Sequence, residues 1–80
     1  MKAIRTRYLP PTDNKGSRYK ATANGVDSVT IPFDYTLEYQ QIAEKAARVL
    51  CDRNGWNYEF VTGQLDNGDY CHILTNKIDH

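Results

Sequence analysis

The side chains best suited to chemistry in this sequence are two thiols and two imidazoles, those of Cys51, Cys71, His72 and His80. Zinc sites usually take their ligands from closely spaced pairs such as Cys-x-x-Cys, and the sequence contains no such pair. Cys71 and His72 are adjacent, so on a β-strand they would point to opposite sides. A Cys–His nucleophilic pair would also need an oxyanion pocket, which no motif supplies. We therefore expect packed thiols and a surface imidazole, with no metal site, no cofactor and no catalytic centre.

Length and composition also argue against an enzyme. The 80 residues are 40% hydrophobic and 25% charged, with ten basic and ten acidic side chains and a formal net charge of zero. Such a chain is too apolar and too neutral to be disordered as a whole. A chain of this size buries roughly 60–65% of the surface that its unfolded form exposes, which leaves a thin core and little room for a deep active site. We expect a single domain over residues 1–80.

Neither a membrane span nor a signal peptide is expected. No run of about 18 apolar residues exists, and residues 1–7 carry charges where a signal peptide would need its apolar stretch. These features favour the cytoplasm. A reducing compartment would keep Cys51 and Cys71 as free thiols, with a disulfide or a redox role as the alternatives.

Five segments alternate between apolar and polar residues, as half-buried strands do. The segments are residues 2–9, 17–23, 26–33, 56–62 and 69–75. The pair Pro10-Pro11 should end the first strand, and Asn24-Gly25 tolerates the positive φ angles of a tight primed turn. Asn67-Gly68 is a second hairpin signal. The first three segments and the turns between them therefore predict a β-meander.

The period changes to 3.6 between residues 37 and 54, which predicts one amphipathic helix. Its apolar stripe consists of Tyr39, Ile42, Ala43, Ala46, Val49 and Leu50. Thr36 or Asp34 is expected to cap the start, and Gly55 to stop the end. Glu44 and Arg48 have the spacing of an i,i+4 ion pair. The resulting order, β-β-β-α-β-β, predicts an α+β fold in which the helix lies across one face of an antiparallel sheet of about five strands.

The neutral total conceals an uneven distribution of charge. Residues 1–20 carry six basic side chains against one acidic side chain, whereas residues 21–44 carry four acidic and no basic side chains. If the first two strands pair with their apolar sides on the helix, Arg5, Arg7, Arg18 and Lys20 project from the open face of the sheet. Four like charges there repel one another unless an anionic partner covers them, although ordinary solvated side chains would fit the same pattern. With Lys15 of the following loop, these residues form the basic candidate surface.

Two further binding modes stay open. Acidic side chains could imitate phosphates and occupy a DNA channel, the candidates being Asp27, Asp34, Glu38, Glu44, Asp66 and Asp69. Exposed rings could instead stack on a single strand, the candidates being Tyr8, Tyr19, Trp56, Tyr58, Tyr70 and His72. Tyr8 and Tyr19 belong to the apolar register that should face the helix, and no ribonucleoprotein-type motif is present, both of which weigh against stacking.

Three segments together resemble a family of small proteins carried by bacteriophages and mobile elements of proteobacteria. They are residues 2–12 (KAIRTRYLPPT), residues 16–21 (GSRYKA) and residues 29–32 (VTIP), and residues 46–51, Gly55-Trp56 and Gly63 fit the same pattern. The resemblance implies no catalytic residue. Small neutral or acidic phage proteins of this size often resemble antagonists of host defence, including anti-CRISPR proteins, which cover the working surface of an effector without chemistry.

The expected function is therefore that of an inhibitor which binds a host protein complex, plausibly a CRISPR effector, in the cytoplasm of the bacterial host and blocks its binding of target DNA. A small nucleic-acid-binding accessory that uses the same basic face is the alternative. Exposed sheet edges also allow self-association, so the chain is expected to be a monomer or a homodimer.

Overall fold

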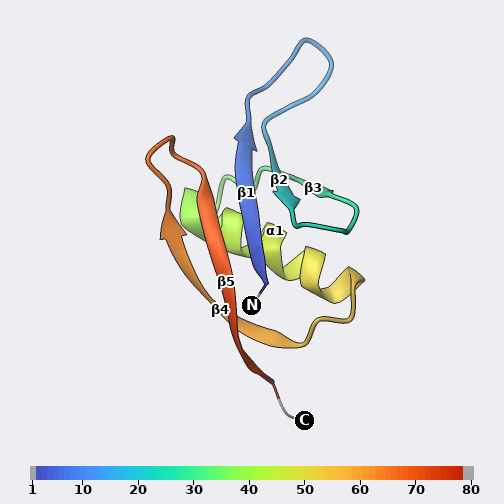
Figure 1. Ribbon diagram of the computed structural model, residues 1–80. Helices are drawn as coiled ribbons and strands as arrows, with labels where there is room; N and C mark the ends of the chain where they lie inside the picture. Colours follow the sequence, from blue (N-terminus) through green and yellow to red (C-terminus); the bar gives the residue numbers. More distant parts are fainter. Residues whose placement is uncertain (1, 79–80) are drawn as a thin grey trace.

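One helix lies across one face of a five-stranded antiparallel sheet in the computed structural model, which describes residues 2–78 (Figure 1). The α+β class and the order β-β-β-α-β-β predicted from the sequence are confirmed. The elements are β1 (Ala3–Leu9), β2 (Arg18–Thr22), β3 (Val29–Pro32), α1 (Tyr39–Arg53), β4 (Tyr58–Gln64) and β5 (Tyr70–Lys77).

The strands lie in the order β3-β2-β1-β5-β4, which places the first strand at the centre of the sheet. The first three strands form the predicted meander. The last hairpin then joins the other side of β1, where Ala3 lies opposite Ile73 and Thr6 lies opposite Tyr70. Figure 1 shows β1 and β5 side by side, so the first and last strands of the chain are neighbours within the sheet. β3 and β4 are left as the two edge strands.

Alternation along the strands separates a helix-facing side from an open side. In β1, Ile4 and Thr6 are buried while Arg5 and Arg7 are exposed. The buried partners on the neighbouring strands include Tyr19 and Leu74, which complete the sheet side of the core. Because side chains of a strand alternate between faces, the residues next to these in sequence must point to the open side.

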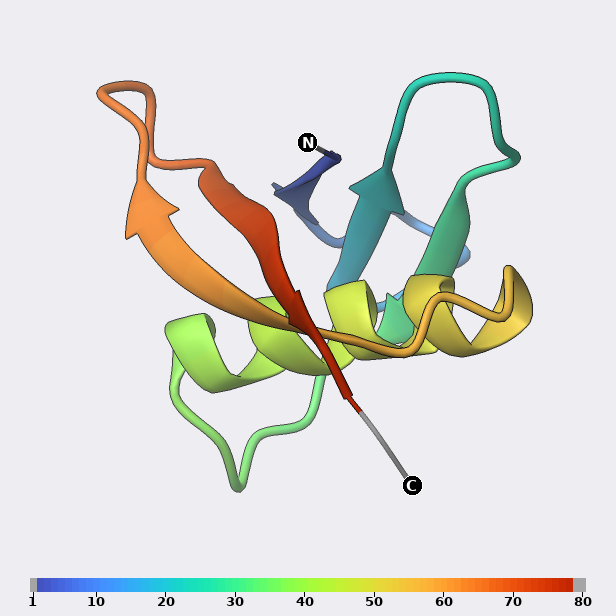
Figure 2. The same ribbon diagram turned by 60° about the horizontal axis from the view of Figure 1, so that its bottom comes forward.

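Helix α1 closes the core with small side chains. Its buried residues are Ile42, Ala43, Ala46, Ala47, Leu50 and Cys51. The alanines let the helix backbone approach the sheet closely, and Figure 2 shows the helix crossing beneath the strands. Tyr39 was predicted on the buried stripe but is 57% exposed, because its ring packs edge-on against Phe33 and Tyr8 and leaves its other side open. No helix within residues 2–78 is long and apolar enough to cross a membrane.

The helix begins at Tyr39, two residues later than the sequence indicated. Glu38 occupies the N-cap position, and its backbone N–H donates to Oε1 of Gln41 at 2.9 Å. The prediction of Thr36 or Asp34 as the cap was wrong. The Asp34 carboxylate instead accepts hydrogen bonds from the backbone N–H and the hydroxyl of Thr36, and so forms a separate turn before the helix.

The end of the helix agrees with the prediction. Gly55 follows the helix with φ of +68°, a backbone conformation that glycine adopts without a Cβ clash. The side-chain amide of Asn54 donates to the carbonyl of Leu50 at 2.9 Å, and the backbone N–H of Trp56 donates to the carbonyl of Cys51 at 2.9 Å. The last carbonyl groups of the helix are thereby satisfied.

The predicted ion pair between Glu44 and Arg48 is absent from the described residues. Strand β4 packs beside this part of the helix and offers both side chains other partners. Glu44 accepts a hydrogen bond from the hydroxyl of Thr62 at 3.0 Å. Arg48 donates to the carbonyl of Tyr58 at 2.8 Å and stacks over the ring of Phe60. Tertiary contacts therefore replaced a local pair that is weak in isolation.

The two hairpin predictions had different outcomes. Gly68, with φ of +92°, closes the β4–β5 turn by donating its N–H to the carbonyl of Leu65 at 2.9 Å, as Asn67-Gly68 predicted. The chain does turn at Asn24-Gly25, with Gly25 at φ of +83°, but the predicted tight primed connection was wrong, because Asn24 has no positive φ and β3 begins at Val29 and not at Val26. Val26 packs against the core from a longer loop and takes no part in the strand.

Candidate functional site

The open face of the sheet carries the basic residues that the sequence singled out. Arg7 of β1 lies directly opposite Lys20 of β2. Two pairs along the strands, and so on the same face, Leu9 lies opposite Arg18, and two pairs in the other direction Arg5 lies opposite Thr22. The structure therefore brings four of the five predicted basic residues to one face, within two neighbouring strands.

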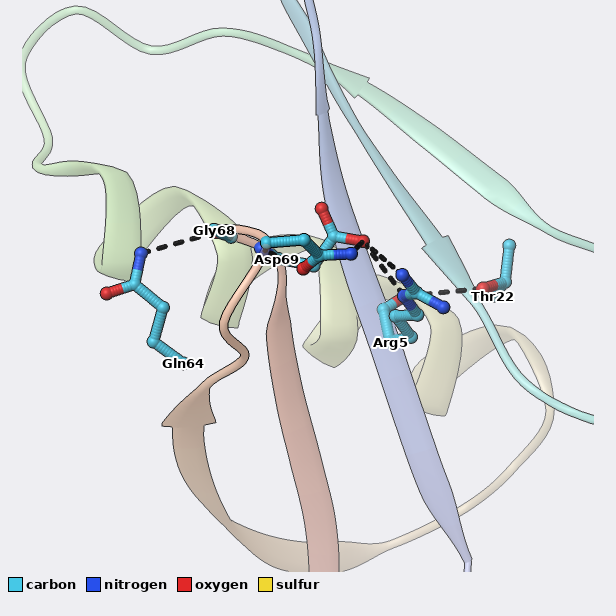
Figure 3. Close-up of polar contacts among 6 residues, drawn as sticks. Arg5, Thr22, Gln64, Gly68 and Asp69 are labelled. Atoms are coloured by element: carbon cyan, nitrogen blue, oxygen red, sulfur yellow. Dashed lines mark hydrogen bonds and ion pairs between the residues drawn. The ribbon is translucent and has the colours of Figure 1, made fainter.

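Arg5 differs from the other three because its charge is compensated within the chain. Its Nη2 and Nε atoms lie 2.7 and 2.8 Å from Oδ2 of Asp69, whose side chain is only 12% exposed (Figure 3). The amide of Asn67 also reaches this oxygen. Asp69 is held in turn by its backbone N–H, which donates to Oδ1 of Asn67 at 3.0 Å. This ion pair joins the centre of the sheet to the β4–β5 turn, so Arg5 contributes little free charge to the face.

Arg7, Arg18 and Lys20 have no such compensation. The ion pairs within residues 2–78 are Arg5–Asp69 and Lys45–Asp34. Arg18 is oriented by its Nε, which donates to the carbonyl of Gly16 at 3.2 Å. The three side chains thus place three positive charges on β1 and β2 without a described carboxylate in contact. We call this trio the basic cluster.

Lys15 lies outside the cluster. It is exposed in the loop between β1 and β2, where its carbonyl accepts a hydrogen bond from the backbone N–H of Thr12 at 2.8 Å. Figure 1 shows this loop extending beyond the end of the sheet. Lys15 can therefore touch a partner of the basic cluster only if that partner reaches past the strands.

The six acidic candidates do not gather in the same way. Asp27 borders a hollow at the end of the helix that also includes Arg53, whereas Glu38 caps its start, about 22 Å away for a helix of 15 residues. Asp66 and Asp69 belong to the β4–β5 turn. Three of the six have side-chain partners within the chain, namely Asp69 with Arg5, Asp34 with Lys45 and Glu44 with Thr62. Thr36 donates two hydrogen bonds to Asp34, which lowers the pKa of that carboxyl group.

The sheet separates Cys71 from Cys51 and His72, which both lie on its helix side. Cys51 lies on the sheet-facing side of α1, where burial raises the pKa of its thiol. Cys71 is half-buried on the open side, opposite Arg5 and Gly63, while His72 points to the helix side. Both cysteines are free. Residues 2–78 contain no group of three or more His, Cys, Asp or Glu side chains placed to hold a metal ion, and His80 lies outside the described residues.

The prediction of a surface imidazole was wrong, because His72 is fully buried. Its Nε2 lies 2.9 Å from the hydroxyl of Thr6, and its Nδ1 lies 2.9 Å from the hydroxyl of Thr62. The hydroxyl of Thr62 donates its one proton to Glu44, so Nδ1 of His72 must be the donor to Thr62 and Nε2 must accept from Thr6. Burial lowers the pKa of His72 to about 4, which keeps this ring neutral.

Aromatic side chains gather where the helix begins. Tyr35 and Tyr39 are 81% and 57% exposed and pack against Phe33, with ring centroids 4.9 and 5.4 Å apart. Neither tyrosine was among the rings that the sequence predicted to be available for stacking. Tyr19 and His72 are buried and unavailable for stacking, and burial is the largest cause that raises the pKa of Tyr19 to about 12. The missed signal is the run from Tyr35 to Tyr39, whose two exposed tyrosines flank the polar start of the helix.

The fold and its open face define a small α+β domain with an uncompensated basic cluster on a sheet. A scan against protein-family models and searches of curated proteins and of solved structures found no match to the chain.

Proposed function

We propose that this protein is a non-enzymatic inhibitor from a phage or mobile element, which acts in the bacterial cytoplasm by binding an acidic surface of a host-defence complex, a CRISPR effector, through its basic cluster. The observation that supports the proposal is the placement of Arg7 directly opposite Lys20, with Arg18 two pairs further along on the same face. Binding of the cluster would block access of target DNA to the effector by occupying the surface, without chemistry.

Electrostatics favours a partner for this face. Like charges directly opposite on a sheet destabilise it, and the described carboxylates that reach basic groups are engaged with Arg5 and Lys45. A partner that brings carboxylates to the face would remove the repulsion. Arginine suits this role because its planar guanidinium group binds a carboxylate through two parallel hydrogen bonds.

The geometry supports the basic version of the inhibitor better than the acidic one. A protein that imitates the phosphates of DNA needs a row of carboxylates whose oxygens are not bonded within the chain. The six acidic candidates are divided among the two ends of the helix, its middle, where Glu44 lies, and the β4–β5 turn, and three of them are bonded to other side chains of the chain.

A nucleic-acid-binding accessory is the second candidate, because the basic cluster would also suit phosphates. Three uncompensated cations limit the number of phosphates that the face can neutralise. The logarithm of affinity would then fall against the logarithm of salt concentration with a slope no steeper than about −3. So few phosphate contacts would give only weak binding to duplex DNA of arbitrary sequence. An acidic protein surface complementary in shape to this face is therefore the favoured partner.

The test compares two double variants with the same change in charge. Arg7→Glu/Lys20→Glu reverses two charges of the basic cluster, and Arg53→Glu/Lys77→Glu reverses two charges away from it. Cleavage of target DNA by a panel of purified CRISPR effectors is measured with each protein. We expect the wild type and the control to inhibit one effector and the cluster variant to lose that inhibition. Equal inhibition by the two double variants, or no inhibition by the wild type of any effector, would contradict the proposal.

A titration against labelled duplex and single-stranded DNA at several salt concentrations separates the two candidates. Binding by the wild type that weakens with salt and disappears in the cluster variant would favour the accessory. Inhibition of an effector without binding of free DNA at low salt would favour the inhibitor.

A further inference from the structure

The two edge strands of the sheet differ in how readily a further β-strand could pair with them. Strand β3 has four residues and ends at Pro32, which has no N–H to donate. Strand β4 has seven residues and contains no proline. Figure 2 shows β4 at the outer side of the sheet, with no further strand beside it. Edge strands of this length are usually protected, so the free edge of β4 calls for an explanation.

The direction of each backbone group of β4 follows from its pairing with β5. The N–H of Leu65 donates to the carbonyl of Asp69 at 2.6 Å, and the hydroxyl of Thr75 in β5 donates to the carbonyl of Glu59. Both observations place the groups of odd-numbered residues toward β5. In an antiparallel ladder the pattern alternates, so Phe60, Thr62 and Gln64 direct their N–H and C=O groups outward.

One end of this free edge is already closed. The carbonyl of Tyr58 accepts a hydrogen bond from the guanidinium group of Arg48 at 2.8 Å, and the register shifts between Tyr58 and Phe60. Within residues 2–78, the unpaired edge therefore consists of six backbone groups, the N–H and C=O groups of Phe60, Thr62 and Gln64. A strand that pairs with this edge can therefore form backbone hydrogen bonds only with Phe60, Thr62 and Gln64.

Exposed apolar side chains accompany the free edge. Val61 is 59% exposed and Leu65 is 39% exposed, and they are two of the four large hydrophobic side chains classed as exposed within residues 2–78. Val61 lies opposite the half-buried Ile73 on the open face. An edge that combines free backbone groups with apolar side chains is suited to strand addition.

We propose that the occupant of this edge is a second copy of the same chain, which pairs its β4 antiparallel to the first about a two-fold axis at Thr62. In this register Thr62 lies opposite Thr62 of the second copy, and Phe60 lies opposite Gln64 of the second copy. All outward N–H and C=O groups of both copies are then bonded. The two sheets join into one sheet of ten strands.

The side chains of β4 are compatible with this self-pairing. Glu59 is the one charged residue of the strand, and the register places it opposite Leu65 of the second copy. The two Glu59 carboxylates lie about 20 Å apart along the strands, so they do not repel at short range. Val61 lies opposite Gly63 of the second copy, which leaves room for its branched side chain. A single two-fold axis covers the β4 edges of both copies at once, which favours a dimer over a longer polymer.

The dimer would also place the basic clusters of the two copies on the same face of the joined sheet. Directly opposite residues of antiparallel strands point to the same face, so the open faces of both copies lie on one side of the joined sheet. The two β1 strands are five strand spacings apart, about 24 Å. This bivalent face is relevant to function only if the proposed function holds, whereas the dimer itself does not depend on it.

Sedimentation of the full chain tests the pairing without any partner protein. We expect a mass of twice 9.2 kDa as the concentration rises from low micromolar to several hundred micromolar. Gln64→Pro removes an outward N–H and blocks the ladder, and Val61→Glu places charges near the two-fold axis. Both should sediment as monomers, while Thr30→Glu on the other edge should dimerise as the wild type does.

Amide hydrogen exchange locates the contact and keeps the test decisive if one variant fails to fold. On concentration, exchange should slow at the amides of Phe60, Thr62 and Gln64 more than at those of Val61 and Gly63, which are already bonded to β5. A monomer throughout the range, dimerisation of Val61→Glu equal to that of the wild type, or protection confined to another strand would overturn the proposal. Because effector inhibition is measured separately, failure of the dimer and failure of the proposed function are distinguishable.

Discussion

His72 Nδ1 lies 2.9 Å from the hydroxyl oxygen of Thr62, its direct partner across β4 and β5. With Thr6 on its other ring nitrogen and Glu44 beyond Thr62, the imidazole belongs to a directed chain of hydrogen bonds that runs from the central strand to the helix. The ring is neutral and holds its proton on Nδ1. A buried network of this kind makes stability sensitive both to pH and to the loss of any one member.

The network predicts a loss of stability in mild acid. The pKa of His72 is about 4 in the folded protein and about 6.5 in the unfolded chain. The unfolded chain therefore takes up the proton first, so this contribution is fully present above pH 6.5 and is lost as the pH falls toward 4. We expect a decrease of about 3 kcal/mol in the free energy of unfolding across this window, measured by urea denaturation. His72→Gln serves as the control, and a profile parallel to that of the wild type would refute the assignment.

Replacing either threonine of the network should leave a buried ring nitrogen without a partner. Thr6→Val removes the donor to Nε2, and Thr62→Val removes the acceptor for Nδ1. We expect each to lower the free energy of unfolding by about 1–3 kcal/mol. Thr30→Val on the exposed side of β3 is the matched control and should change stability by less than about 0.5 kcal/mol. Equal effects at all three positions would show that the hydrogen bonds of His72 contribute nothing.

Lys20→Glu should stabilise the isolated protein. The substitution replaces a like-charge pair with Arg7 by an opposite-charge pair, worth up to about 1 kcal/mol across a sheet. The gain should shrink at high salt, because partly exposed charges are screened. Thermal unfolding at low and high salt measures it, with Lys77→Glu as a control of equal charge. A destabilised Lys20→Glu protein would contradict the view that function, and not stability, maintains the basic cluster.

Asp69→Asn tests the link between the sheet centre and the β4–β5 turn. The substitution removes the charge that holds Arg5, whose side chain is 54% exposed and can return to water. We expect a loss of about 1–2 kcal/mol in the free energy of unfolding. A double-mutant cycle with Arg5→Gln isolates the coupling, which should vanish if the 2.7 Å contact does not persist in solution.

Much of the fold follows from patterns that are local in sequence. Alternation along residues 2–9 and 17–23 already separated Arg5, Arg7, Arg18 and Lys20 from the apolar positions, and the structure places them on the open face. The helix was recognised because its period is distinct, and Gly55 marked its end. These features depend on neighbours within a few residues, which is the range over which periodicity and turn chemistry act.

The tertiary structure alone decided which charges are free and which polar groups are buried. Arg5 and Asp69 are 64 residues apart in sequence, and they meet only because β5 pairs with β1. The same pairing buries His72 beside Thr6, where a surface imidazole was expected, and it leaves β4 at the edge. Strand order is set by the total burial and hydrogen bonding of the whole sheet, so alternation within one strand could assign the basic residues to a face but could not identify their neighbours.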